Sequence, residues 1–224
     1  MSSFWQPIPH IAPSIISADL GKLREECQRI EEAGADSIHI DLMDGHFVSN
    51  FTLGESTIQV IRRATTLPLD LHLMIYNPFA YIERFAATGV NGITIHFEAT
   101  EQVKDTLQYI RKCNLQAGLA FSPETACSFL PDYIHECDLL LLMTVHPGFS
   151  GQAFLPEMLE KISLARSLCE KTFPIQVDGG INLHTATECF RAGASHFVSG
   201  SHLWHQENLQ SAIAQMRRSL KESR

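Results

Sequence analysis

Short apolar runs alternate along the chain with longer segments in which apolar residues recur every three or four positions. That spacing places the apolar side chains on one helix face, and it is clearest in residues 19–33, 155–169 and 209–220. Residues 125–136 carry a weaker version that Pro131 interrupts. The apolar runs predict eight strands, near residues 10–15, 37–40, 69–73, 92–96, 116–120, 139–143, 175–177 and 196–199.

A recurring junction connects the predicted helices to the strands that follow them. Gly34, Gly89 and Gly193 each stand between the two, at the left-handed position where glycine ends many helices. Eight β–α alternations predict an α/β fold, a (β/α)8 TIM barrel forming a single domain over residues 1–224, with its core at about 10–220. The alternative is an open doubly wound sheet, which needs fewer strands or a Gly-rich dinucleotide turn after the first strand; residues 13–19 contain no such turn.

Composition excludes several functional classes. The 17 basic and 25 acidic residues give a net charge of −8, which argues against general affinity for nucleic acid or a membrane surface. No apolar run approaches the ~20 residues of a membrane span, and residues 1–10 lack the basic and apolar regions of a secretory signal. The six cysteines form no CxxC pair, which favours free thiols in a reducing compartment. We therefore expect a cytoplasmic protein.

Metal-capable side chains cluster at predicted strand ends. His39 and Asp41 share one face of the second strand, and His72 and Asp178 end the third and seventh. Burying such groups costs several kcal/mol unless they are paired or bind a metal. Two imidazoles with two carboxylates suit Zn²⁺, Fe²⁺, Mn²⁺ or Co²⁺ better than Mg²⁺ or Ca²⁺. Asp70 has the inward parity of His72 and is expected to support a ligand or to be an interior polar residue.

Glycine-bearing loops follow the last three predicted strands, at residues 147–152, 178–181 and 199–201. Glycine lets backbone N–H groups approach an anion closely, and the loops after strands seven and eight are the usual phosphate site of such barrels. Met43, Met74 and Met143 also fall at strand ends. They are either ordinary core filling or a water-poor ceiling over a reacting carbon.

Six phrases carry a resemblance to one family over about residues 10–204. They are residues 12–19, 41–48, 69–74, 143–149, 177–182 and 200–201. Among them, Met43-Asp44-Gly45-His46 and Thr144-Val145-His146-Pro147-Gly148-Phe149 are the most specific. On these phrases the chain resembles the ribulose-phosphate 3-epimerase family.

The resemblance implies interconversion of D-ribulose 5-phosphate and D-xylulose 5-phosphate, a step of the pentose phosphate pathway, by a homo-oligomeric isomerase. It implies one divalent metal ion held by His39, Asp41, His72 and Asp178, and no organic cofactor. Asp41 matches the proton acceptor and Asp178 the proton donor for one direction. The substrate-binding positions that match are Ser14, His72, Gly148, Phe149, Ser150, Gly151, Asp178, Gly179, Gly180, Gly200 and Ser201.

Three positions depart from the family pattern. Ser49 stands where proline is usual, Ser150 where glycine is common, and His202 where small or aliphatic residues are usual. None removes a matched ligand or proton-transfer carboxylate. They leave open the stiffness of the loops and the phosphate affinity.

The sequence leaves three alternative functions to distinguish from this one. A 3-epimerase of a six-carbon ketose phosphate such as D-allulose 6-phosphate has very similar motifs, although the phrase at Asp178–Ile181 favours the ribulose phosphate branch. A non-catalytic phosphosugar-binding barrel would be marked by loss of a carboxylate, and both Asp41 and Asp178 are present. A decarboxylase would want a lysine at a strand end, and none of the predicted strands ends in one.

Overall fold

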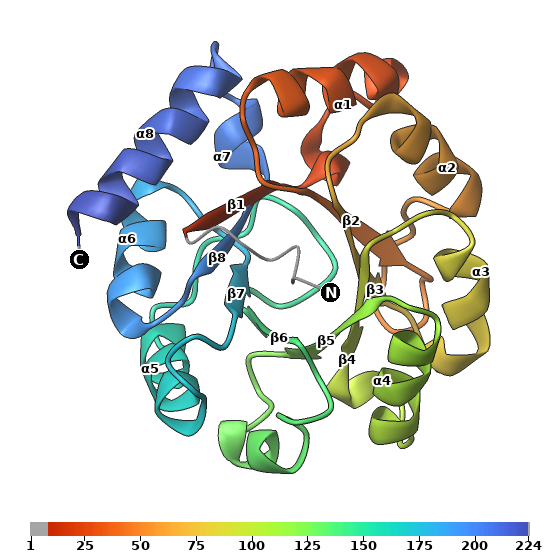
Figure 1. Ribbon diagram of the computed structural model, residues 1–224. Helices are drawn as coiled ribbons and strands as arrows, with labels where there is room; N and C mark the ends of the chain where they lie inside the picture. Colours follow the sequence, from red (N-terminus) through yellow and green to blue (C-terminus); the bar gives the residue numbers. More distant parts are fainter. Residues whose placement is uncertain (1–8, 224) are drawn as a thin grey trace.

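Eight parallel strands form a barrel at the centre of the structure, and the helices surround it (Figure 1). The structure is a computed structural model that describes residues 9–223, so residues 1–8 of the segment tested for a secretory signal lie outside it. Hydrogen bonds join the strands in the order β1-β8-β7-β6-β5-β4-β3-β2. A parallel bridge between Ser14 and His39 connects the two ends of this order. The strands are β1 (His10–Pro13), β2 (Ile38–Met43), β3 (Leu69–Met74), β4 (Gly92–His96), β5 (Gln116–Phe121), β6 (Leu139–Met143), β7 (Ile175–Asp178) and β8 (His196–Ser199).

The predicted barrel and all eight predicted strands are confirmed, with shifts at the ends. Strand β1 stops at Pro13 because the chain then turns into a 3-10 helix, η1 (Ile15–Ser17). Strand β2 continues to Met43, so Asp41 lies inside the strand. The prediction ended this strand at residue 40 because Asp41 is polar, whereas all side chains of β2 are buried.

The helices lie outside the barrel and connect successive strands. Asp19 caps the short η2 (Leu20–Lys22) through the Gly21 N–H, so the predicted 19–33 helix begins as a 3-10 turn. The interrupted 125–136 segment forms only the 3-10 helix η5 (Cys127–Asp132), which contains Pro131. The remaining helices are α1 (Leu23–Glu32), α2 (Glu55–Ala64), η3 (Pro78–Tyr81), α3 (Ile82–Ala86), η4 (Phe97–Ala99), α4 (Val103–Lys112), α5 (Met158–Leu168), α6 (Leu183–Ala192), α7 (Ser201–Trp204) and α8 (Leu209–Glu222).

The inside of the barrel is apolar on one side and polar on the other. Leu139, Leu141 and Met143 of β6, together with Ala120 and Val145, form a small apolar cluster separate from the main core. Other strands place buried polar side chains, among them His10 and Gln176, both fully inaccessible to solvent. Because unpaired buried polar groups are costly, this half of the interior has to be organised by hydrogen bonds. It is the part of the barrel that carries the candidate site.

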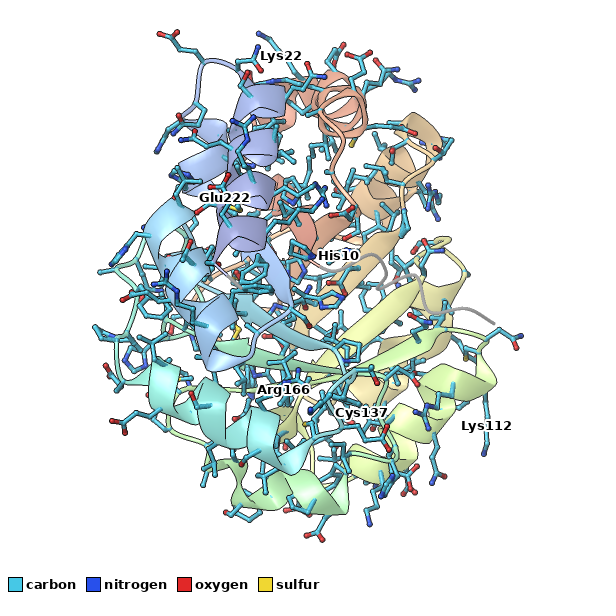
Figure 2. The ribbon with its side chains drawn as sticks, turned by 60° about the vertical axis from the view of Figure 1, so that its left-hand side comes forward. His10, Lys22, Lys112, Cys137, Arg166 and Glu222 are labelled. Atoms are coloured by element: carbon cyan, nitrogen blue, oxygen red, sulfur yellow. The ribbon has the colours of Figure 1, made fainter. Side chains whose placement is uncertain are left out.

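Charged side chains occupy the outer surface of the helices. In Figure 2, Lys112 projects away from the barrel at the end of α4, and Lys22 lies at the periphery. All six cysteines are free thiols, as the absence of CxxC pairs predicts. Within residues 9–223, every helix is too short or too polar to cross a membrane.

Candidate metal centre and active site

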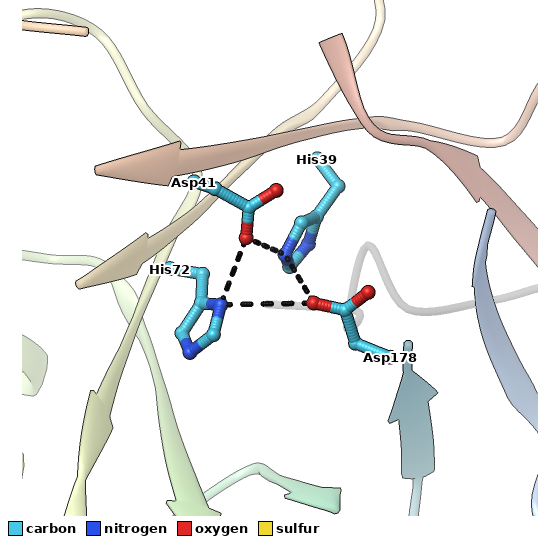
Figure 3. A group of neighbouring side chains, drawn as sticks. All are labelled: His39, Asp41, His72 and Asp178. Atoms are coloured by element: carbon cyan, nitrogen blue, oxygen red, sulfur yellow. Dashed lines mark hydrogen bonds and ion pairs between the residues drawn. The ribbon is translucent and has the colours of Figure 1, made fainter. Parts of the chain in front are cut away.

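Four side chains converge at one end of the barrel (Figure 3). Oδ1 of Asp41 lies 3.2 Å from Nε2 of His39 and 3.0 Å from Nδ1 of His72. Oδ2 of Asp178 lies 3.8 Å and 3.9 Å from the same two nitrogens. One donor atom from each residue therefore falls within 4.8 Å of the other three.

The barrel itself brings these residues together. Parallel pairing sets Asp41 of β2 beside His72 of β3, and His39 is two residues earlier on the same inward face. Asp178 ends β7 and enters the cluster from a different side (Figure 3). Both imidazoles are fully buried, whereas the Asp178 side chain keeps 16% of its surface exposed. The cluster is open to ligands mainly on the side of Asp178.

The cluster has the chemistry of a divalent metal site. Nδ1 of His39 lies 2.9 Å from Oδ2 of Asp70, which also accepts a hydrogen bond from Gln176. Nε2 of His39, the nitrogen that faces the cluster, is buried without a hydrogen-bond partner. A cation would satisfy that orphaned lone pair and neutralise the two carboxylates. Asp70 thus lies behind a ligand rather than among the four.

Burial and neighbouring charges shift the pKa values of the two carboxyls in the cluster in opposite directions. Burial alone would raise the pKa of Asp41, but His39 and His72 hold it well below its usual range. Burial and the nearby Asp41 charge raise the pKa of Asp178 to about 7. Burial lowers the pKa of the His72 imidazole to about 4. In the metal-free site Asp41 is therefore ionised and Asp178 is partly protonated near neutral pH.

A cavity opens directly above the cluster. It is a small cleft that opens to solvent. Asp41 and Asp178 line its base, and the predicted Met43, Met74 and Met143 line its wall. His72 is fully buried beneath it and is not among the lining residues. The other predicted substrate-binding residues all line it: Ser14, Gly148, Phe149, Ser150, Gly151, Gly179, Gly180, Gly200 and Ser201.

The loop after β7 passes too close to its neighbours for any side chain. A Cβ on Gly179 would lie 2.4 Å from Val145 Cγ2, and the residue has a φ of +117°. A Cβ on Gly180 would lie 2.6 Å from the Phe154 backbone nitrogen. Thr144 fixes this loop, since its hydroxyl donates to the Asp178 carbonyl at 2.9 Å and also to the Gly179 carbonyl. These glycines hold backbone against the cavity where an anion can approach it.

Two departures from the family pattern, Ser49 and Ser150, lie on loops, and the third, His202, lies in a short helix. Ser49 and Ser150 are exposed, and the neighbouring Asn50 donates a 2.7 Å hydrogen bond to the Gly148 carbonyl, which ties the two loops together. His202 lies in α7, where Trp204 donates from Nε1 to the Ser14 carbonyl at 2.8 Å. The short helix is thereby fastened to the end of β1.

Sequence reasoning missed two kinds of site residue. Ile16, Ser17 and Gln152 line the cavity, but they carry no signal that separates them from ordinary loop residues. His96 was identifiable, because it ends β4 and shares the parity of the inward-facing Thr94. It contacts His72 with its Nε2 2.9 Å from Nε2 of that ligand candidate.

Comparison with known proteins agrees with this geometry. The model of the ribulose-phosphate 3 epimerase family matches residues 10–204. Ribulose-phosphate 3-epimerase of Chlamydia pneumoniae is 48% identical over 204 residues, 89% of each chain. That of Bacillus subtilis is 41% identical over 211 residues, 92% of this chain and 97% of the relative.

Solved structures share the fold at low sequence identity. KGPDC from Streptococcus mutans superimposes with a TM-score of 0.75 at 14% identity, covering 96% of this chain and 98% of the other. A mutant tryptophan synthase alpha-subunit from Pyrococcus furiosus gives 0.69 at 16% identity, with the same coverage. These likenesses establish the barrel, while the family rests on the sequence matches. The chain belongs to the ribulose-phosphate 3-epimerase family.

Proposed function

We propose that the protein interconverts D-ribulose 5-phosphate and D-xylulose 5-phosphate by proton transfer at carbon 3. The observation that carries this proposal is the pair Asp41 and Asp178, two carboxyls on separate strands at the base of one cavity. Their pKa values are displaced in opposite directions. Inverting a carbon requires removal of a proton from one face and delivery of a proton to the other, which two separate carboxyls can perform.

In the direction that starts from ribulose 5-phosphate, the ionised Asp41 accepts the proton of carbon 3. Electrons from that C–H bond move onto the neighbouring carbonyl, which gives an enediolate. Asp178, in its protonated form, then donates to the opposite face of carbon 3 and the carbonyl reforms. For the reverse reaction the two carboxyls exchange roles.

A bound divalent cation supplies positive charge against the negative charge that develops on the substrate oxygens. His39 would offer Nε2, His72 would offer Nδ1, and the two aspartates would each offer one oxygen. We propose Zn²⁺, Fe²⁺, Mn²⁺ or Co²⁺, because imidazole ligands favour these ions over Mg²⁺ and Ca²⁺. Prolonged chelation should lower activity and these ions should restore it; normal activity in protein shown to be metal-free would contradict this assignment.

The rest of the cavity fits a phosphorylated ketose. Met43, Met74 and Met143 provide apolar walls that limit water around the reacting carbon. Gly179, Gly180, Gly200 and Ser201 form the part of the wall that would bind phosphate, through backbone N–H groups and a hydroxyl. No lysine or arginine lines the cavity among the described residues, so backbone donors are expected to carry the phosphate affinity.

We also propose that the enzyme acts in the cytoplasm as a homo-oligomer. Six free thiols suit a reducing compartment. Beside the cavity, Leu20, Phe51 and Phe149 line one groove while exposing 46%, 77% and 58% of their surfaces. A second copy would cover this apolar surface. Light scattering after gel filtration measures the mass, and a monomer at micromolar concentration would contradict the assembly.

The decisive experiment is incubation of metal-loaded protein with D-ribulose 5-phosphate in D₂O, followed by NMR of carbon 3. Xylulose 5-phosphate carrying deuterium at carbon 3 is the expected product. Product without deuterium would contradict proton exchange through the carboxyls. Absence of product, together with turnover of D-allulose 6-phosphate, would move the substrate to the six-carbon class. Absence of turnover with either sugar would leave a binding barrel.

A further inference from the structure

A buried chain of hydrogen bonds runs from His72 away from the metal cluster. Nε2 of His72 lies 2.9 Å from Nε2 of His96, and Nδ1 of His96 lies 3.0 Å from Oε2 of Glu98. Both imidazoles are fully inaccessible to solvent. The chain crosses from β3 to β4 and ends in η4, so three successive elements hold it.

When both imidazoles are neutral, as metal ligation by His72 requires, one arrangement of protons satisfies this chain. The Glu98 carboxylate can only accept, so Nδ1 of His96 carries a proton and donates it. In a neutral imidazole the other nitrogen is then an acceptor, so Nε2 of His96 accepts from Nε2–H of His72. Nδ1 of His72 then carries a lone pair rather than a proton, and the 3.0 Å contact of this nitrogen with Oδ1 of Asp41 becomes one that a cation between the two atoms would satisfy. That nitrogen is the one directed at Asp41 and Asp178.

Glu98 is itself held in place as an anion. Its Oε1 accepts a 2.8 Å hydrogen bond from the Ser122 N–H and a further one from the Thr125 hydroxyl. Burial would raise the pKa of Glu98, but hydrogen bonds and charge interaction with His96 lower it to about 2. The Ser122 hydroxyl is also 3.4 Å from Nδ1 of His96, farther than Glu98. The Phe47 ring, 4.8 Å from the His96 ring between centroids, covers the pair.

His39, the other imidazole of the cluster, is oriented by a carboxylate without an intervening histidine. Asp70 accepts from Nδ1 of His39 directly, and this leaves Nε2 of His39 for the cluster. The two histidines therefore present different ring nitrogens, each selected by a carboxylate behind it. Asp70 contacts His39 directly, whereas Glu98 acts on His72 through His96.

We propose that His96 and Glu98 are positioning residues that set the proton of His72 on Nε2, so that Nδ1 is free to bind a divalent cation. The inference rests on the metal site of the proposed function. It assigns to His96 and Glu98 an effect on metal affinity, which a purely structural pair would lack.

Replacement of Glu98 by glutamine keeps the shape of the side chain but reverses the donor–acceptor direction of each hydrogen bond from Glu98 to His72. The Ser122 N–H needs an acceptor, so the amide oxygen of Gln takes the place of Oε1 and its NH₂ group faces His96. Nδ1 of His96 must then accept, Nε2 carries the proton, and Nε2 of His72 has to accept in turn. The proton of His72 moves to Nδ1, where it competes with the metal.

The experiment is titration of metal-free protein with Co²⁺, read by its visible absorption and by competition with a chelator of known affinity. Glu98→Gln should bind Co²⁺ about 10- to 100-fold more weakly than wild type. His96→Leu, which cannot accept from His72, should lose as much, whereas His96→Gln keeps an acceptor and should stay within about threefold. Glu188→Gln is the matched control, since Glu188 pairs with His184 at 3.3 Å on the exposed face of α6.

The outcomes separate this inference from the proposed function. Wild-type protein that binds no Co²⁺ would overturn the metal site and, with it, the role of His96 and Glu98. Wild-type binding that Glu98→Gln and His96→Leu leave unchanged would overturn the positioning role alone. A loss in His96→Gln as large as in His96→Leu would also overturn it. Thermal unfolding of each metal-free variant verifies that the variant is folded before Co²⁺ is added.

Discussion

The Ser14 hydroxyl donates a 2.6 Å hydrogen bond to Oδ2 of Asp41, while Oδ1 of the same carboxylate faces His39 and His72. The carboxylate is thus used on both edges, one toward the metal cluster and one toward β1. Trp204 holds Ser14 in turn through its backbone carbonyl. Because a hydrogen bond to the charged form stabilises it, Ser14 helps to keep Asp41 ionised.

Replacement of Ser14 by alanine removes this donor and, with it, a hydroxyl that lines the cavity. We expect kcat/KM to fall by about tenfold or more, since hydrogen bonds to charged groups are worth about 1.5–3 kcal/mol. The pKa of Asp41 should rise but stay below pH 5, so the kcat/KM profile should fall in height and keep its shape. Steady-state kinetics between pH 5 and 9 measure both effects. Ser163→Ala on the exposed side of α5 is the control, and a Ser14→Ala profile that overlays wild type would contradict the assignment.

Replacement of Asp178 by asparagine should stop epimerisation but still allow Asp41 to exchange the proton of carbon 3. We expect turnover to fall by at least about 10³-fold, because the amide cannot donate a proton to carbon 3. Asp41 can still remove and return the proton on its own face, so ribulose 5-phosphate should gain deuterium in D₂O without forming xylulose 5-phosphate. NMR of metal-loaded variant, with metal content verified, makes the measurement.

Two results would count against that division of labour. Turnover near the wild-type rate would remove Asp178 from the reaction. Xylulose 5-phosphate formed with deuterium by Asp178→Asn would show that another group delivers the second proton.

The strands and the cluster were predictable because they follow from residue-by-residue periodicity. Alternation along β2 places His39 and Asp41 on one face, and parallel pairing brings the end of β3 beside them. The barrel topology then carries Asp178 of β7 to the same end. Each step uses only local pattern and the rule that parallel strands end together.

Pairings between side chains were not predictable in this way. Asp70 was expected to support a ligand, but nothing in the local pattern tells that this ligand is His39, or that Gln176 of β7 reaches the same carboxylate across 106 positions of sequence. The choice depends on the stagger of the barrel and on rotamers, neither of which leaves a trace in residue type. Positions of Ile16 and Ser17 in the cavity wall likewise depend on how η1 turns after β1.

His10 makes the fold sensitive to mild acid. Burial lowers the pKa of its imidazole to about 4, and the ring contacts Ser37 through Nε2 at 2.8 Å. Between about pH 6.5 and pH 4 the unfolded chain binds a proton that folded His10 does not, so this residue destabilises the fold as pH falls. The full effect is about 3 kcal/mol at a pKa displacement of that size.

Urea unfolding of the metal-free protein at pH 7 and pH 5 measures this effect. His10→Gln should lose less stability between the two pH values than wild type does, by about 1–2 kcal/mol. Groups common to both proteins cancel in this difference, including His39. The exposed His205→Gln is the control and should follow wild type. Equal losses in His10→Gln and wild type would show that His10 does not carry the acid sensitivity.

Gly179 is the position at which the fold and the substrate site depend on the same backbone. Alanine there would place its Cβ 2.4 Å from Val145 Cγ2 and 2.9 Å from the Val145 nitrogen, at a φ of +117°. We expect Gly179→Ala to lose about 2 kcal/mol or more of unfolding free energy. KM for the phosphosugar should also rise, because the loop that meets the phosphate has to move. Gly54→Ala is a matched control: its Cβ meets nothing within 4 Å, and the loss should be less than about 1 kcal/mol. Denaturant unfolding together with KM measures both effects, and a Gly179→Ala variant with wild-type stability and KM would contradict the role given to this loop.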